Sequence, residues 1–321
     1  MISRRLLRIK ALMALYAFNR REDEDLPKAE KELMFSIEKT YDLYHLLILL
    51  LLELSDAVAG KIDQSRQKRI PSHEDLNPNT RFISNRLLAQ LRSNKQFQKY
   101  VSSRKLSWVN YMHTVRLLYN KLIAWDVYIE YMKSPESNYQ LDKKLIFRLM
   151  NELVRDSEDI VNSLEEQSIY WNDDMEYVMI MLDKTFKKFR ADSGEDTALM
   201  PLFKNAEDEE FVKILFRKAI LNTKKYSELI DHNTTNWEIE RIALMDILVM
   251  QMAVTEILEF PEIPVKVTLN EYIEIAKYYC TSKSSTFVNG ILDNIVKEIR
   301  EKGMFTKYGR GLVGESIEKE N

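Results

Sequence analysis

Glycine and proline are scarce in this sequence, with seven of each among 321 residues. Glycine therefore occurs at about a third of its average usage, and proline at under half of its own. A chain with few glycines has few tight turns, which argues against a sheet protein. Leucine, lysine, glutamate, methionine and arginine, all good helix formers, make up much of the rest. We therefore predict an all-α fold.

Cysteine and long apolar runs are also nearly absent. The single cysteine, Cys280, excludes an internal disulfide and is typical of a reducing compartment, so we expect a cytoplasmic protein. The longest strongly apolar run, Leu46–Leu52, is much shorter than the roughly 20 residues of a membrane-spanning helix. We interpret it as a helix buried in protein. The first residues are basic but lack the apolar segment and cleavage site of a signal peptide.

Residue patterns that carry catalysis or bind metals are missing. The four histidines are far apart and have no partner at metal-ligand spacing: His45, His73, His113 and His232. No serine stands in a nucleophile-elbow setting. Gly309, Gly311 and Gly314 match G-x-G-x-x-G, but we expect neither the strand before it nor the helix after it that a dinucleotide site needs. We predict no catalytic residue, no metal, no cofactor and no enzyme activity.

Charge is distributed unevenly. The formal net charge is only −3, yet residues 1–21 contain six basic side chains and no acid: Arg4, Arg5, Arg8, Lys10, Arg20 and Arg21. A local basic segment on a mildly acidic protein is typical of binding to a polyanion. The alternative is an ordinary solvated surface, which terminal arginines often form.

The basic segment also has a helical pattern. Ser3 is a suitable N-cap, and apolar residues recur at i, i+3, i+4 and i+7 to form one stripe: Ile9, Leu12, Met13 and Tyr16. Arg4 and Arg8 are one turn apart, so we expect a basic edge beside that stripe.

Further helical patterns follow along the chain, with loops predicted at 65–80 and 191–205, where proline, asparagine and glycine interrupt the periodicity. The helices are predicted near 30–63, 80–101, 107–132, 140–166, 172–190, 206–231, 236–260, 266–280 and 284–302. Gly303 follows Arg300 and Lys302, which indicates a helix C-terminus there.

Three segments carry a resemblance to a known family. They are SRRLLRIKALMALYAF at 3–18, EIERIALMDILVMQMAVTEILEFPEIPVKVTLNE at 238–271, and NEYIEIAKYYCTSKSSTFVNGILD at 270–293. In this order they resemble the NusB family of bacterial transcription antitermination factors. The resemblance implies a NusB-like helical domain from residues 1–21 plus 205–303, a helical insertion at 22–204, and a flexible tail at 304–321.

The resemblance also implies a function and an RNA site. NusB proteins bind a short single-stranded RNA element, boxA, together with the ribosomal protein NusE, within the antitermination complex of RNA polymerase at ribosomal RNA operons. The matching RNA-binding positions are Arg4, Arg5 and Arg8, to which Lys10 adds charge. In the FVNG motif, Phe287 beside Asn289 is placed to stack on an unpaired base. Core packing is the alternative role for Phe287.

The resemblance implies a partner surface for NusE at Tyr16 and Asp246. Core packing is the alternative role for Tyr16, which lies on the apolar stripe. Two departures from the family pattern stand beside these matches. Leu6 and Leu7 interrupt the family's longer arginine run, and Gln251 occupies a position where arginine is usual.

Other interpretations remain open. One is a protein-interaction scaffold with the NusB fold that has lost RNA binding. An RNA cytosine methyltransferase with a NusB-like domain would need a Rossmann-type catalytic domain that nothing here supplies. In the insertion, basic and aromatic residues alternate between Lys95 and Trp108, a mixture compatible with RNA but common on ordinary helices. The sequence also leaves open whether the chain forms a homodimer.

Overall fold

The computed structural model describes residues 1–21, 25–234 and 242–313. Every element in these residues is helical, so the prediction of an all-α fold is confirmed. The chain divides into two compact units: unit 1 holds residues 1–2 and 36–202, and unit 2 holds residues 3–35 and 203–321. Each unit therefore has its own core. Unit 2 combines an N-terminal and a C-terminal part of the chain.

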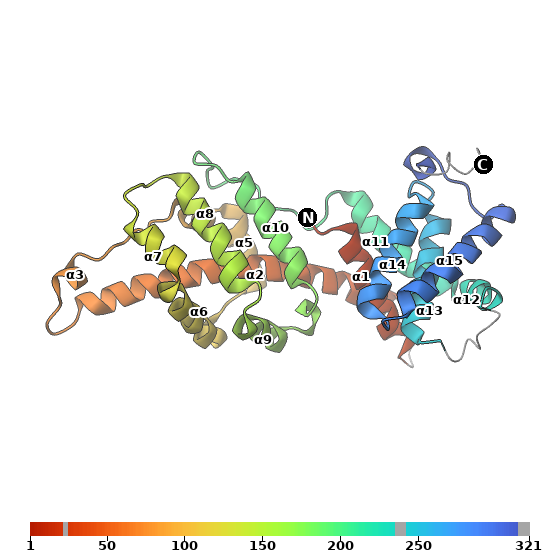
Figure 1. Cartoon of the computed structure of the whole chain (residues 1–321), viewed down its shortest axis with the longest axis horizontal. Helices are drawn as coiled ribbons and strands as arrows, with labels where there is room; N and C mark the ends of the chain where they lie inside the picture. The colour runs from red at the N-terminus through yellow and green to blue at the C-terminus, as the bar shows by residue number, and fades with distance from the viewer. Residues whose placement is uncertain (22–24, 235–241, 314–321) are drawn as a thin grey trace. The chain divides into compact units, whose positions relative to one another are not determined.

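Unit 1 is a helical domain built around the long helix α2, Leu26–Arg66, whose residues from Ser36 onward belong to this unit. The remaining elements are α3 His73–Leu76, α4 Arg86–Ser93, α5 Lys95–Arg104, η1 Val109–Tyr111, α6 Met112–Ala124, α7 Asp126–Lys133, α8 Tyr139–Leu149, the π-turn Met150–Val154, α9 Glu158–Gln167, η3 Ile169–Trp171 and α10 Met175–Lys188 (Figure 1).

Several helices of unit 1 are shorter than the sequence pattern predicts. The expected helix at 80–101 is two helices, because Asn94 adopts an extended backbone and its side chain caps α5 by accepting from Phe97 N. The expected helix at 107–132 is likewise broken at Trp125, which is extended between α6 and α7. Apolar periodicity continues through such short breaks, so it does not reveal them.

The leucine-rich run lies in the core of unit 1. All its residues except Leu49 are buried, and Leu47 has no exposed surface. Trp108 donates its indole N–H to Leu46 O at 2.9 Å, and Trp171 donates to Lys39 O at 2.7 Å. Among the described residues, α2 is the one helix long and apolar enough to cross a membrane, but 67% of its most apolar window is buried inside the protein. The pattern is therefore that of a core helix.

Unit 2 packs its helices around α13, Leu244–Glu259. The others are α1 Arg4–Asn19, the first turns of α2, α11 Ala206–Leu221, α12 Thr223–His232, α14 Val265–Tyr279, α15 Ser284–Glu301 and the 3-10 turn η5 Gly309–Leu312. Helix α13 contacts α1, α11, α12, α14 and α15, and 11 of its 16 residues are buried. The first helix of the chain thus packs on helices more than 200 residues away in sequence.

The C-terminal segment differs from the expected flexible tail. Helix α15 ends as predicted, with Gly303 in the left-handed region at φ +61°. Residues 304–313, however, pack against the end of α13, where the buried Lys307 ammonium donates to Ile257 O and Phe260 O, both at 2.9 Å. Residues 314–321, including Gly314 of the glycine motif, lie outside the described residues.

Candidate nucleic-acid interface

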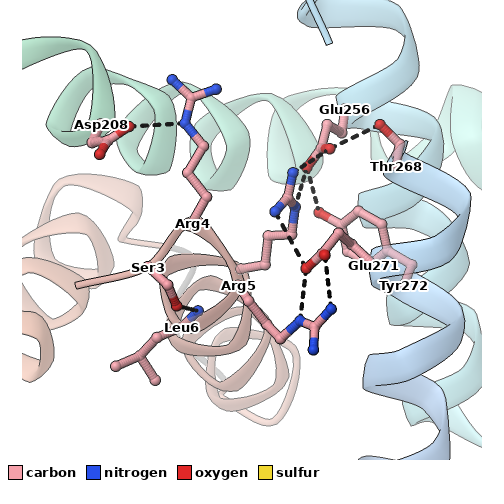
Figure 2. Close-up of polar contacts among 10 residues, drawn as sticks. Ser3, Arg4, Arg5, Leu6, Asp208, Glu256, Thr268, Glu271 and Tyr272 are labelled. Atoms are coloured by element: carbon pink, nitrogen blue, oxygen red, sulfur yellow. Dashed lines mark hydrogen bonds and ion pairs between the residues drawn. The ribbon is translucent and has the colours of Figure 1, made fainter. Parts of the chain in front are cut away.

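Helix α1 begins where the sequence predicts. Ser3 is its N-cap, and the Ser3 hydroxyl accepts a hydrogen bond from Leu6 N at 3.2 Å (Figure 2). Leu6 and Leu7, which interrupt the arginine run, have no exposed surface, and α1 packs on α11 and α13. These leucines hold α1 in the core of unit 2. Arg4, Arg5 and Arg8 lie before and after them in the same helix.

Arg8 is buried, contrary to the expected exposed basic edge. Its guanidinium donates two hydrogen bonds to the Glu256 carboxylate, both at 2.7 Å, and the side chains of the pair are 4% and 0% exposed. Thr268 and Tyr272 of α14 donate their hydroxyls to Glu256 at 2.8 and 3.3 Å. Burial alone would lower the pKa of Arg8, but Glu256 holds that pKa above its usual value. Arg8 thus ties α1 to α13.

Arg5 and Arg4 are partly exposed at the surface beside this pair. Arg5 forms a two-point ion pair with Glu271, with both N–O distances 2.8 Å (Figure 2). The hydrogen bonds from Arg5 hold the pKa of Glu271 below its usual range. Arg4 donates only its Nε to Asp208, at 2.8 Å, and its side chain is 34% exposed. The terminal nitrogens of Arg4 therefore remain open to a further acceptor.

These arginines line an open pocket of about 560 Å³. Its walls come from the start of α1, the start of α14 and the C-terminal segment. The lining residues are Ser3, Arg4, Arg5, Arg8, Glu262, Ile263, Pro264, Val267, Glu271, Arg310 and Val313. Four arginines and two glutamates line the pocket, and Arg4 and Arg8 are also paired with Asp208 and Glu256 behind the wall. The partly exposed guanidinium groups of Arg4 and Arg5 are the groups of this wall that suit an anionic ligand.

The structure separates the other expected RNA-binding residues from this pocket. Lys10 is buried, on the side of α1 that faces the core. Phe287 and Asn289 are half-buried near the start of α15, close to Ser284, which bonds Asp246 at the start of α13. Glu256, beside the arginines, is ten residues further along α13, about 15 Å along the helix axis. The arginines and the FVNG motif therefore do not form one compact site.

The expected partner surface is mostly buried. Asp246 is 6% exposed and accepts a hydrogen bond from Ser284 Oγ at 2.9 Å. Burial, together with a hydrogen bond to Asp246, raises the pKa of the Cys280 thiol well above its usual value. Gln251, where the family has arginine, is 2% exposed and donates to Ala219 O at 2.6 Å. Tyr16 is half-exposed and has the Arg20 guanidinium over its ring, with Cζ 5.4 Å from the centroid.

In unit 1, several residues of the basic–aromatic mixture of the insertion are buried or paired with acids. Trp108 and Phe97 are buried in the core. Arg104 pairs with the buried Asp42 at 2.8 Å, and Lys95 pairs with Glu195 at 2.5 Å. Lys99 and Lys105 remain exposed, but Tyr100 is half-buried, so no fully exposed aromatic of the mixture lies with them.

Sequence reasoning missed Glu256, Glu271 and Arg310. The spacing of Thr268, Glu271 and Tyr272 at i, i+3 and i+4 places them on one face of a helix, which was a usable signal for α14. Nothing in the sequence connects Arg310 with the first helix. Among the residues that the structure describes, no group of three His, Cys, Asp or Glu side chains is placed to hold a metal ion.

The fold and the pocket define an all-α protein whose second unit presents an arginine-lined cavity. Comparison with known proteins agrees with this class. The model of the NusB family matches residues 181–297. The transcription antitermination protein NusB of Salinibacter ruber is 43% identical over 115 residues, which is 36% of this chain and 72% of that protein. The NusB proteins of Chloroherpeton thalassium and Natranaerobius thermophilus are 42% and 32% identical over 35% and 30% of this chain, and 53% and 70% of their own lengths. The chain belongs to the NusB family.

The family match covers only part of the chain. Helix α1 and most of unit 1 lie outside residues 181–297, so the match to the family model does not include the arginine segment. No solved structure matches the chain.

Proposed function

We propose that this protein is a transcription antitermination factor that binds boxA-type single-stranded RNA together with the ribosomal protein NusE and promotes read-through of ribosomal RNA operons. Unit 2 is then the NusB-like domain and unit 1 its helical insertion. The proposal follows from the family and from the name of the relatives, transcription antitermination protein. The observation that carries the RNA site is the arginine-lined pocket at the start of α1.

The proposed mechanism divides the arginines into two roles. Arg8 is neutralised and buried by Glu256, so it positions α1 and does not contact the ligand. Arg4 and Arg5 hold their guanidinium groups at the surface, where phosphate oxygens bind by charge-assisted hydrogen bonds. Arg4 contributes its terminal nitrogens, and Arg5 shares its charge between Glu271 and the ligand. Tyr16, a half-buried aromatic of α1, is the proposed contact with NusE.

Fluorescence anisotropy of a labelled boxA-like RNA tests the proposal. We expect tighter binding when NusE is present, and weaker binding as salt rises, because phosphate contacts release counterions. The double variant Arg4→Ala/Arg5→Ala removes two cations, so the slope of log K against log salt falls by about 1.4 in magnitude, at roughly 0.7 for each contact with a single strand.

A matched control is Lys224→Ala/Lys225→Ala, which removes two exposed cations of α12 outside the pocket. This control keeps the wild-type slope if binding is local to α1. Equal losses in both double variants would mean that RNA binds by overall charge alone.

The alternative, a scaffold of the same fold without RNA binding, is favoured by one specific observation. Arg4, Arg5 and Arg8 each already pair with a carboxylate of unit 2. A protein that binds NusE but not the RNA, with or without NusE at low salt, would have this function and not the proposed one.

A further inference from the structure

The segment after α15 is fixed to unit 2 by backbone and side-chain contacts. The Lys307 ammonium caps the last turn of α13 through Ile257 O and Phe260 O, where a cation also meets the negative end of the helix dipole. Tyr308 N donates to Pro261 O at 3.2 Å. These contacts hold the segment against the loop between α13 and α14.

Two glycines make this docking possible. Gly309 has φ +55°, a backbone conformation that other residues adopt with difficulty. A Cβ added to Gly311 would lie 2.0 Å from Pro261 O, so only glycine allows the segment to approach so closely. The glycines therefore serve a close backbone approach, and the described residues before them, Met304–Tyr308, form no strand.

The docked segment delivers Arg310 to the pocket. Arg310 lies on the 3-10 turn η5 between the two glycines, is exposed, and lines the pocket with Arg4 and Arg5. Arg4, Arg5 and Arg8 are all paired with acids. Within residues 1–21, 25–234 and 242–313, Arg310 has no carboxylate at ion-pair distance. Among the described residues it is thus the arginine of the pocket wall that has no ion pair.

We propose that residues 304–313 are an accessory RNA-binding segment, in which Lys307 docks the segment and Arg310 binds a phosphate of the RNA strand that lies across Arg4 and Arg5. The inference rests on the proposed function and adds a contact to it. The segment follows the residues matched by the family model, which end at 297. A guanidinium with an uncommitted charge gains more from a phosphate than one already paired.

The test uses the full chain and the labelled boxA-like RNA at several salt concentrations. Arg310→Gln is expected to weaken binding roughly three- to tenfold and to lower the salt slope by about 0.7. Arg69→Gln, which removes an exposed arginine of unit 1, is the matched control and should leave both values unchanged.

A double-mutant cycle separates docking from direct contact. Lys307→Met undocks the segment, so its effect should equal that of Arg310→Gln, and the double variant should lose nothing further. Hydrogen exchange should show the amides of 304–313 exposed in Lys307→Met and protected in Arg310→Gln.

The outcomes distinguish this inference from the proposed function. If Arg310→Gln binds RNA like the wild type while Arg4→Ala/Arg5→Ala is impaired, the accessory contact is wrong and the proposed function stands. Additive losses in the cycle would overturn the docking role of Lys307. A wild-type protein that binds no RNA would end both proposals.

Discussion

Arg8 and Glu256 form a buried ion pair between the first helix and α13, with Thr268 and Tyr272 completing the hydrogen bonds of the carboxylate. Removing one partner leaves a charge in the core without compensation. We expect Arg8→Met to lower the free energy of unfolding of unit 2 by about 3–5 kcal/mol. Urea unfolding read by hydrogen exchange of α13 amides measures this loss.

The double variant Arg8→Met/Glu256→Leu is the control for the charge. It should recover much of the stability, because neither charge remains buried. Part of the loss should persist, since the hydroxyls of Thr268 and Tyr272 lose their acceptor at about 1 kcal/mol each. A double variant as unstable as Arg8→Met would show that shape, and not charge, holds α1 in place.

His45 is a second buried polar residue, in unit 1. Its ring stacks on Tyr100 with centroids 3.9 Å apart, its Nδ1 lies 2.9 Å from Tyr41 O, and its Nε2 has no hydrogen-bond partner among the described residues. Burial lowers the pKa of His45 from 6.5 to about 4, although Tyr41 O and Asp42 act in the opposite direction. The folded protein therefore holds this ring neutral.

The lowered pKa predicts a pH dependence of stability. Above pH 6.5 the ring is neutral in both states and contributes no difference. As pH falls toward 4, the unfolded chain takes up a proton that the folded one refuses, so unit 1 loses about 2 kcal/mol by about pH 5. His45→Phe keeps the aromatic packing and should remove this dependence. The prediction fails if the wild-type and His45→Phe stabilities follow the same curve between pH 7 and 5.

At the scale of elements, α2 and the C-terminal segment are the most informative. The short apolar run Leu46–Leu52 predicted a helix buried in protein, and 67% of the most apolar window of α2 is buried inside unit 1. We expected a flexible tail at residues 304–321 because the end of a chain is commonly poorly ordered. Residues 304–313 dock through a lysine, backbone hydrogen bonds and a glycine contact, and sequence hydrophobicity does not report such contacts.

Helix α1 shows which features an apolar pattern predicts and which it does not. Its N-cap at Ser3 and the burial of Ile9 and Leu12 agree with the predicted pattern. The predicted exposed basic edge does not agree, because Arg8 and Lys10 are both buried. A stripe of apolar residues predicts which face of a helix is buried. It does not predict that Arg8 is buried too, because that depends on the ion pair with the buried Glu256.

At the scale of the whole molecule, the two units have separate cores. Leu47 of unit 1 and Leu292 of unit 2 both have no exposed surface. Each leucine-to-alanine change should cost about 2–5 kcal/mol. We expect Leu47→Ala to reduce amide protection in α4, α5 and α10, and Leu292→Ala to reduce it in α13 and α14, as measured by hydrogen exchange. Equal loss in both units from either variant would mean that they unfold as one body.

The sequence by itself determined the helical class, the family and the start of the first helix. It also determined that the basic segment is residues 1–21. These depend on composition, local periodicity and capping, which act over a few residues. The tertiary structure alone decided which arginines are exposed, because Asp208, Glu256 and Glu271 reach them from more than 200 residues away. It also decided that Arg310 joins their pocket. Charge balance in a site depends on distances in space, and one sequence does not specify these.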